Sequence, residues 1–274
     1  MSRVLITGAS GVLGTRLAAT LRATLFAREV VSLVRRAPRS AQEVWWDPAA
    51  ARIDLARCEG FDAVVHLAGE NVGSGEGLLA FTGRWTASKK HAILESRRQG
   101  TALLARSLAA LKRPPRVLVS ASGVGFYGAH AGAGAGGAGL DEAAPRGAGF
   151  LAEVAEAWEG ATAPAAAAGV RVVQLRFGAI LAGSGGVVEK LRLPFSLCLG
   201  GPIGSGQQWM PWVALEDAVR AVQHAIVECV RAGRAFSDLC FVSSLCALLQ
   251  PSHRPIFFPR SCPPLLTARA CRAP

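Results

Sequence analysis

The fold of this chain is decided by the stretch Arg3-Val4-Leu5-Ile6-Thr7-Gly8-Ala9-Ser10-Gly11-Val12-Leu13-Gly14. An apolar run of strand type ends at its first glycine, and a leucine stripe of helical spacing follows at Leu13, Leu17, Leu21 and Leu25. The pattern predicts a strand, a glycine turn and a helix whose N-terminus lies at the mouth of a sheet. Free N–H groups and the helix dipole bind a pyrophosphate at such a point. The stretch therefore predicts a dinucleotide site; the alternative is the same α/β unit without a ligand.

The three glycines of this turn have separate expected roles. Gly8 permits the tight turn, Gly11 lets the backbone approach the phosphates, and Gly14 lets the helix pack closely on the strand. We expect the cofactor to contact the turn at seven positions, which are Thr7, Gly8, Ser10, Gly11, Val12, Leu13 and Gly14.

Length and composition limit the classes of protein that this chain can represent. Its 274 residues suit one α/β domain of about 200–250 residues with an appendage. The apolar runs are interrupted before about 18 residues, so we expect no membrane span. A strand so near the first residue leaves no room for a targeting peptide, which favours the cytoplasm. The alternative is a plastid or mitochondrion, with a transit peptide missing from this sequence.

Charge and cysteine content point to small anionic ligands rather than to nucleic acid or metal. The net charge is +11, from 26 arginines and four lysines against 19 acidic residues. The basic residues are scattered singly, without interleaved aromatic residues, so we expect no nucleic-acid partner. Seven cysteines without a CxxC pair predict neither a zinc site nor a disulfide framework.

The second predicted strand, Glu29–Val34, is followed directly by Arg35 and Arg36. In a doubly wound nucleotide-binding domain, the end of this strand meets the adenosine ribose. An acid there binds the 2′-hydroxyl of NAD, and an arginine accepts the 2′-phosphate of NADP. Because no acid is present, NADP is favoured over NAD. The alternative is that the two arginines only solvate a loop.

A further strand, Asp62–Gly69, ends in small residues, which suit close passage of a cofactor. His66 lies within its apolar run, and we interpret it as a hydrogen-bonded structural histidine rather than a catalytic one. The four residues that we place beside the cofactor here are Leu67, Ala68, Gly69 and Glu70.

The rest of the chain predicts alternating helices and strands. A short third strand is expected at Glu43–Pro48, with its tryptophans in the core, and a long helix after residue 83 is ended by Pro114-Pro115. The polar face of that helix is expected to carry Lys89, Lys90, Arg97 and Arg98. The later expected elements are a strand at 116–122, a flexible Gly/Ala loop at 131–139, a helix with Leu151, Val154 and Trp158, a strand at 170–176, a glycine-rich loop at 193–207 and a helix from Glu216.

Several motifs together resemble one family. They are the glycine turn, His66-Leu67-Ala68-Gly69-Glu70-Asn71, Ser120-Ala121-Ser122 with Tyr127-Gly128, and Leu193-Pro194-Phe195 through Gly200-Gly201-Pro202, Gly204-Ser205-Gly206-Gln207 and Pro211-Trp212. This combination resembles the short-chain dehydrogenase/reductase superfamily. Within its atypical, extended branch, the chain is similar to the epimerase-family proteins also labelled SulA-like nucleoside-diphosphate-sugar epimerases. The resemblance covers residues 3 to about 227.

The resemblance implies an α/β fold, with a Rossmann-like doubly wound parallel sheet and an incomplete small C-terminal substrate region. It implies NADP, with NAD the weaker alternative, and a substrate bound over the C-terminal strand ends. Gly8, Gly11 and Gly14 would hold the pyrophosphate, and Arg35 the 2′-phosphate. Ser120 would belong to the cofactor site, and Ser122 would be the catalytic candidate that hydrogen-bonds a substrate oxygen.

The chain departs from the superfamily at its Tyr-x-x-x-Lys pair, in which the tyrosine is the general acid/base. The only tyrosine is Tyr127, and the residue four places on is Ala131. The stretch where the motif should lie reads Phe150-Leu151-Ala152-Glu153-Val154. Enzyme activity is therefore left open, and substitute proton carriers would have to come from Glu70, Lys90, His91 and Glu153.

We divide the chain into residues 1–228, an NAD(P)-binding domain that includes a substrate-loop region at 178–215, and residues 229–274. The second segment combines clustered Cys and Pro with little periodicity, and we expect it to be poorly ordered rather than a basic functional tail. Two functions remain: an NADP(H)-dependent oxidoreductase or epimerase acting on a nucleotide-sugar or small carbonyl substrate, or a catalytically inactive NADP(H)-binding sensor or protein-interaction module. The sequence does not predict the oligomeric state.

Overall fold

A seven-stranded sheet forms the centre of the computed structural model, which describes residues 2–24, 27–73, 85–128, 140, 142–197 and 210–232. The strands are β1 (Ser2–Thr7), β2 (Ala27–Val34), β3 (Glu43–Asp47), β4 (Arg52–Ile53), β5 (Ala63–His66), β6 (Val117–Gly123) and β7 (Arg171–Phe177). Their order is β4-β3-β2-β1-β5-β6-β7, and every pair is parallel except β3 with β4. Since β1 pairs with both β2 and β5, the strand order reverses there, and ligands bind at such switch points in doubly wound sheets.

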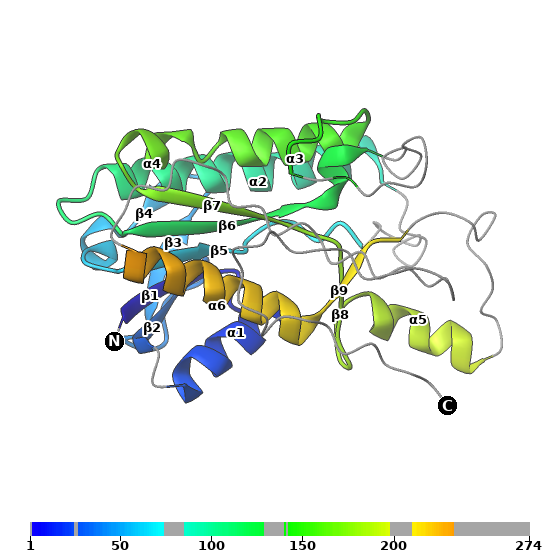
Figure 1. Cartoon of the computed structure of the whole chain (residues 1–274), viewed down its shortest axis with the longest axis horizontal. Helices are drawn as coiled ribbons and strands as arrows, with labels where there is room; N and C mark the ends of the chain where they lie inside the picture. The colour runs from blue at the N-terminus through cyan, green and yellow to red at the C-terminus, as the bar shows by residue number, and fades with distance from the viewer. Residues whose placement is uncertain are drawn as a thin grey trace.

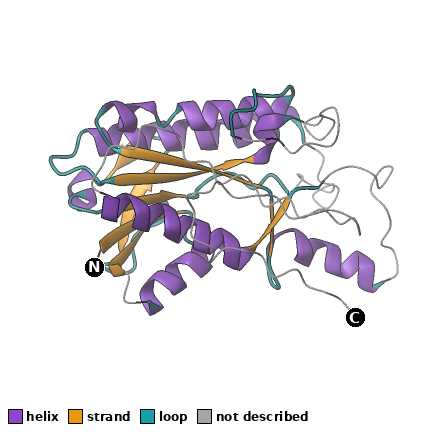
Figure 2. Ribbon diagram, in the orientation of Figure 1, coloured by secondary structure: helices purple, strands orange, loops and turns teal. Residues whose placement is uncertain are grey.

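Helices cover both faces of the sheet (Figure 1, Figure 2). On one face lie α1 (Val12–Ala23) and α6 (Leu215–Ala232), and on the other α2 (Ala87–Ala109), α3 (Phe150–Gly160) and α4 (Ala163–Ala167). Short 3-10 helices occupy Leu55–Cys58 and Val124–Tyr127. Beyond the carboxyl ends of the sheet strands lie the two-stranded parallel sheet of β8 (Ala179–Leu181) and β9 (Trp212–Ala214), and α5 (Gly186–Ser196). The predicted Rossmann-like doubly wound fold is confirmed.

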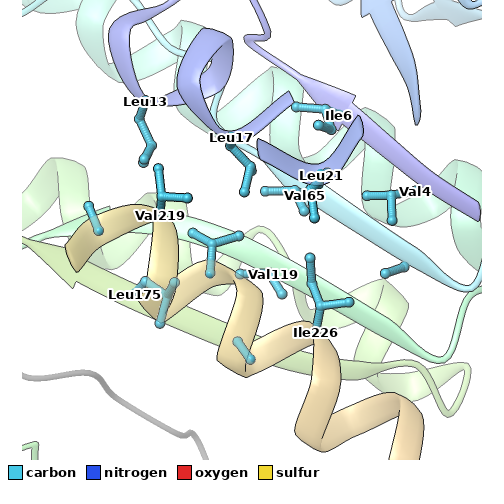
Figure 3. Close-up of a cluster of buried hydrophobic side chains, with 14 of the residues drawn as sticks. Val4, Ile6, Leu13, Leu17, Leu21, Val65, Val119, Leu175, Val219 and Ile226 are labelled. Atoms are coloured by element: carbon cyan, nitrogen blue, oxygen red, sulfur yellow. The ribbon is translucent and has the colours of Figure 1, made fainter. Parts of the chain in front are cut away.

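Two apolar cores fill the space between the sheet and its helices. Alternation along β1 sends Val4 and Ile6 toward α1 and α6, and Leu5 toward α2. Leu13, Leu17 and Leu21 of the predicted leucine stripe pack in the first of these cores, where Val219 and Ile226 of α6 approach them (Figure 3), and Leu25 lies outside the described residues. This packing anchors the N-terminus of α1 against the end of β1.

Several predicted elements differ in the structure. Residues 193–195, expected in a loop, belong to the last turn of α5. The expected polar face of α2 is wrong at Lys89, which is buried, and at Arg97, which is half-buried. Both bend back onto the loop that follows β5. Short elements such as α4, β8 and β9 were not predicted. The expected loops at 131–139 and 200–207 and the segment 233–274 lie outside the described residues.

Candidate functional site

The glycines of the β1–α1 turn bring two strand ends and one helix into close contact. Gly8 has φ +71°, and a Cβ there would lie 2.7 Å from the carbonyl carbon of Leu67 in the neighbouring strand end. A Cβ on Gly14 would lie 2.2 Å from the carbonyl oxygen of Gly8, so only glycine lets α1 approach the turn this closely. Gly11 differs from both. It is exposed, and its nearest neighbour would be the Gly8 oxygen at an ordinary 3.4 Å.

Gly11 is also the N-cap residue of α1, and the helix start fits an anion. Among the described residues no side chain caps this helix, and its first turn holds no acid. The first-turn N–H groups and the positive end of the helix dipole are therefore free to hold phosphate oxygens. A Cβ on Gly185 would lie 2.6 Å from a methyl carbon of Val12, so the β8–α5 connection passes over the side of this turn.

A buried hydrogen-bond chain ties the ends of β1 and β5 to α2. The Thr7 hydroxyl accepts from the N–H groups of Leu67 and Ala68 at 3.1 and 3.2 Å, so it donates its proton to His66 Nδ1 at 2.7 Å. His66 Nε2 then carries the ring proton and donates to Thr101 Oγ1 at 2.8 Å. Burial, with a smaller contribution from the charge of Arg97, lowers the pKa of His66 to about 4. The structural interpretation of His66 is confirmed.

The two arginines after β2 have different surroundings. Arg36 donates to both carboxylate oxygens of Glu43 at 2.8 and 2.5 Å. That pairing, followed by the bond from the Arg39 N–H, lowers the pKa of Glu43 to about 2. Arg35 is exposed and makes no ion pair within the part of the chain that the structure describes. Its guanidinium is the one at this strand end that can meet a further anion.

The loop after β5 is bound to α2 by cations. Glu70 accepts from Lys89 Nζ at 2.6 Å through its carboxylate and from Arg97 at 3.0 Å through its carbonyl. The Arg97 guanidinium stacks over the Trp158 ring at 4.7 Å, and a Cβ on Gly69 would lie 3.1 Å from its central carbon. Gly69 therefore makes room for Arg97. Burial lowers the pKa of Arg97 to about 10.

The predicted serines of β6 are both buried. Ser120 bonds its own strand through the Ala121 carbonyl. Ser122 donates to Glu159 Oε1 at 2.7 Å, and the same carboxylate forms a two-point ion pair with Arg176 at 2.7 Å. Arg176 also donates to the Tyr127 hydroxyl at 3.0 Å. The Ser122 hydroxyl is thus committed to a buried carboxylate in this arrangement.

Phe150 begins α3 and the stretch in which the Tyr-x-x-x-Lys pair was expected. Its ring makes an edge contact with Trp85 at 5.5 Å between centroids, and the ammonium of Lys90 lies 5.5 Å from its centre. Among the four substitute proton carriers, Glu70 is held by Lys89, and His91 and Glu153 are exposed. Lys90 is the one that contacts Phe150.

The sequence did not predict which side chains hydrogen-bond the candidate site residues and their neighbours. These partners are Thr101, Arg97, Glu159 and Arg176. All four lie in ordinary helical or strand patterns. The only available signal was a charged residue in an otherwise apolar strand, as with Arg176 in β7.

Comparison with known proteins gives a family that fits the observed fold and the glycine turn. The family model described as NAD dependent epimerase/dehydratase family matches residues 4–237. The chain belongs to the NAD-dependent epimerase/dehydratase family. The predicted resemblance is confirmed, and the match extends across the sheet and over β8, α5, β9 and α6.

Relatives within this epimerase family include an epimerase family protein of Mycobacterium leprae, 40% identical over 81% of this chain and 67% of its own length. An Arabidopsis thaliana relative named as chloroplastic is 36% identical over 81% of this chain and 62% of its own. Parts of these longer proteins therefore have no counterpart in the match.

Two solved structures are similar in both sequence and fold. A nucleoside-diphosphate sugar epimerase from Corynebacterium glutamicum superposes with TM-score 0.68 at 38% identity, covering 82% of this chain and 44% of that one. Human epimerase family protein SDR39U1 (isoform 2), solved with NADPH, superposes with TM-score 0.67 at 31% identity, covering 83% and 70%. Within the described residues no helix has the length and apolar character that a membrane crossing requires.

Proposed function

We propose that this epimerase-family protein binds NADP(H) at the β1–α1 turn and uses it in an oxidoreductase or epimerase reaction on a small carbonyl or nucleotide-sugar substrate. The observation that carries the proposal is the N-terminus of α1, which no described side chain caps and which begins at the exposed Gly11, where the strand order reverses. The NADPH in the human relative supports the choice of cofactor.

The predicted cofactor residues at three strand ends have separate proposed parts. Gly11 and the first-turn N–H groups of α1 hold the pyrophosphate, and Arg35 binds the 2′-phosphate. Arg36 holds the same corner in place through Glu43. The segment Leu67–Glu70 lines the cofactor beside the end of β5. The hydrogen bonds of Thr7 with His66, Leu67 and Ala68 hold this segment in place.

The bound cofactor would supply or accept a hydride, and the chain would have to supply or accept the matching proton. The stretch Phe150–Val154, where the superfamily's pair was expected, holds neither tyrosine nor lysine, so we place this proton transfer with Glu70, Lys90, His91 or Glu153. Lys90 is preferred because its ammonium contacts the Phe150 ring.

A second candidate is an NADP(H)-binding sensor or interaction module without turnover. Two observations favour it. Phe150 has no ionisable group, and the Ser122 hydroxyl already donates to the largely buried Glu159 carboxylate. A cofactor site can persist under these conditions because it is built from the other half of the sheet.

One experiment separates the two candidates. NADPH and NADH are titrated by fluorescence into the full chain, and NADPH oxidation is then followed over a panel of small carbonyls and nucleotide sugars. Binding with turnover supports the enzyme, and binding without turnover supports the sensor. Failure of both dinucleotides to bind contradicts both candidate functions.

We place the protein in the cytoplasm, or in an organelle as the Arabidopsis relative's name suggests.

A further inference from the structure

Two of the four lysines in this chain bind one loop, and a third lies on the helix turn beside it. Lys89 and Lys90 lie in the first turn of α2, and Lys190 lies far along the chain in α5. Lys89 Nζ donates to the Glu70 carboxylate at 2.6 Å, and Lys190 Nζ donates to the carbonyl oxygen of Gly73. Lys90 lies one residue from Lys89 on the same turn. We call Lys89, Lys90 and Lys190 the lysine rim.

The loop Glu70–Gly73 that the rim surrounds is held on several sides. The Glu70 carbonyl accepts from Arg97 at 3.0 Å, and the Val72 carbonyl accepts from the Trp85 indole N–H at 2.9 Å. With Lys190 on the Gly73 carbonyl, three of the four loop carbonyls already have protein donors. A loop fixed in this way keeps the rim cations in place before any ligand arrives.

Positive charge exceeds negative charge at this loop. In the described part of the chain, Glu70 is the only carboxylate within ion-pair distance of the rim or Arg97, and it pairs with Lys89. Lys90, Arg97 and Lys190 form no ion pair there. The positive end of the α2 dipole adds to the same excess, because the first turn of α2 contains no acid. An anion placed here would be stabilised by all of these groups.

The floor beside the rim is aromatic. The Lys90 ammonium lies over Phe150, which in turn contacts the edge of Trp85, the same residue that bonds Val72. The loop directly follows β5, whose last residues line the switch point. A ligand with an acidic group and a less polar reacting part would therefore meet cations and an aromatic surface at once.

We propose that the lysine rim and the loop Glu70–Gly73 form a subsite for the acidic group of the substrate, a carboxylate or a phosphate. This subsite rests on the proposed function, because the bound anion belongs to a substrate only if the protein catalyses that reaction. It selects carbonyl compounds that carry an oxyanion over neutral ones. The ammonium groups act as compact point charges toward that oxyanion.

The test uses inorganic pyrophosphate and malonate as probes, titrated by calorimetry into the full chain with NADPH present. Lys90→Gln and Lys190→Gln are compared with Lys112→Gln, which removes the same charge from an exposed lysine outside the rim. We expect each rim variant to weaken binding of the preferred probe by about fivefold or more, the effect of one charge-assisted hydrogen bond. Lys112→Gln should bind as the wild type does. The tighter probe identifies phosphate or carboxylate as the group recognised.

Three results would overturn the proposal. Neither probe binds the wild type, the rim variants bind the probes unchanged, or Lys112→Gln loses as much affinity as they do. Release of NADPH by pyrophosphate, followed by its fluorescence, would place the anion at α1 and would also overturn it. Failure of the proposed function is detected separately, because NADPH then does not bind the wild type in the fluorescence titration. In that case the probes are titrated into wild type and variants without NADPH.

Discussion

Acidification should destabilise this protein through one buried histidine. His66 is fully buried between Thr7 and Thr101, and its pKa is lowered from 6.5 to about 4, first by burial and then by the charge of Arg97. As the pH falls below 6.5, the unfolded chain takes up a proton that the folded chain refuses until about pH 4. The stabilisation is thus complete above pH 6.5 and is lost toward pH 4. At about 1.4 kcal/mol per pH unit, the loss reaches about 3 kcal/mol.

Urea unfolding of wild type and His66→Gln at several pH values between 7 and 4 checks this expectation. Carboxylates also titrate in this range, so the quantity of interest is the difference in slope between the two proteins. The wild-type free energy of unfolding should fall more steeply by up to about 1.4 kcal/mol per pH unit. His91→Gln, which removes an exposed imidazole from α2, is the control for a general change of charge. Equal slopes for wild type and His66→Gln would refute the reasoning.

Three further substitutions test the turn and the buried ion pair. Gly14→Ala puts a methyl group 2.2 Å from the Gly8 oxygen and should cost about 1–3 kcal/mol of stability, measured by urea unfolding. Gly11→Ala has room for its methyl, so stability should change by no more than about 0.5 kcal/mol, while NADPH binding, followed by fluorescence, should weaken about tenfold. Unchanged NADPH affinity would argue against the pyrophosphate site. Arg176→Met leaves the Glu159 carboxylate buried without its partner and should cost about 3–5 kcal/mol, part of which Glu159→Gln should restore in the double variant.

Sequence reasoning succeeded where the signal is local. The apolar run of β1, the glycine spacing and the leucine stripe of α1 each fall within a few residues, and their order predicts the strand, turn and helix; the doubly wound sheet was implied by the family resemblance. His66 could be interpreted as structural because a titratable group within an apolar strand costs free energy unless it is hydrogen-bonded. Its partner Thr101, 35 residues away, has no sequence signal of its own.

The errors concern long basic side chains. Lys89 and Arg97 were assigned to the polar face of α2 because they are charged. Lys89 lies four residues before the buried Ile93 and Arg97 four residues after it, so helical spacing places both on the buried face. Their flexible stems carry the charged groups to the loop after β5, where Glu70 accepts them through its carboxylate and its carbonyl. The meeting of Lys190 with Gly73 is hidden for a different reason, since it depends on how α5 packs.

The NADP site at this turn can be tested through the ratio of NADH to NADPH dissociation constants in wild type and in Arg35→Asp. We expect the wild type to bind NADPH more tightly by about tenfold or more, the effect of a charge-assisted contact to the 2′-phosphate. Arg35→Asp should abolish or reverse that preference, because it replaces the unpaired cation at the end of β2 with an acid. A wild-type ratio near one, or a preference that survives Arg35→Asp, would contradict the assignment of an NADP site to this turn.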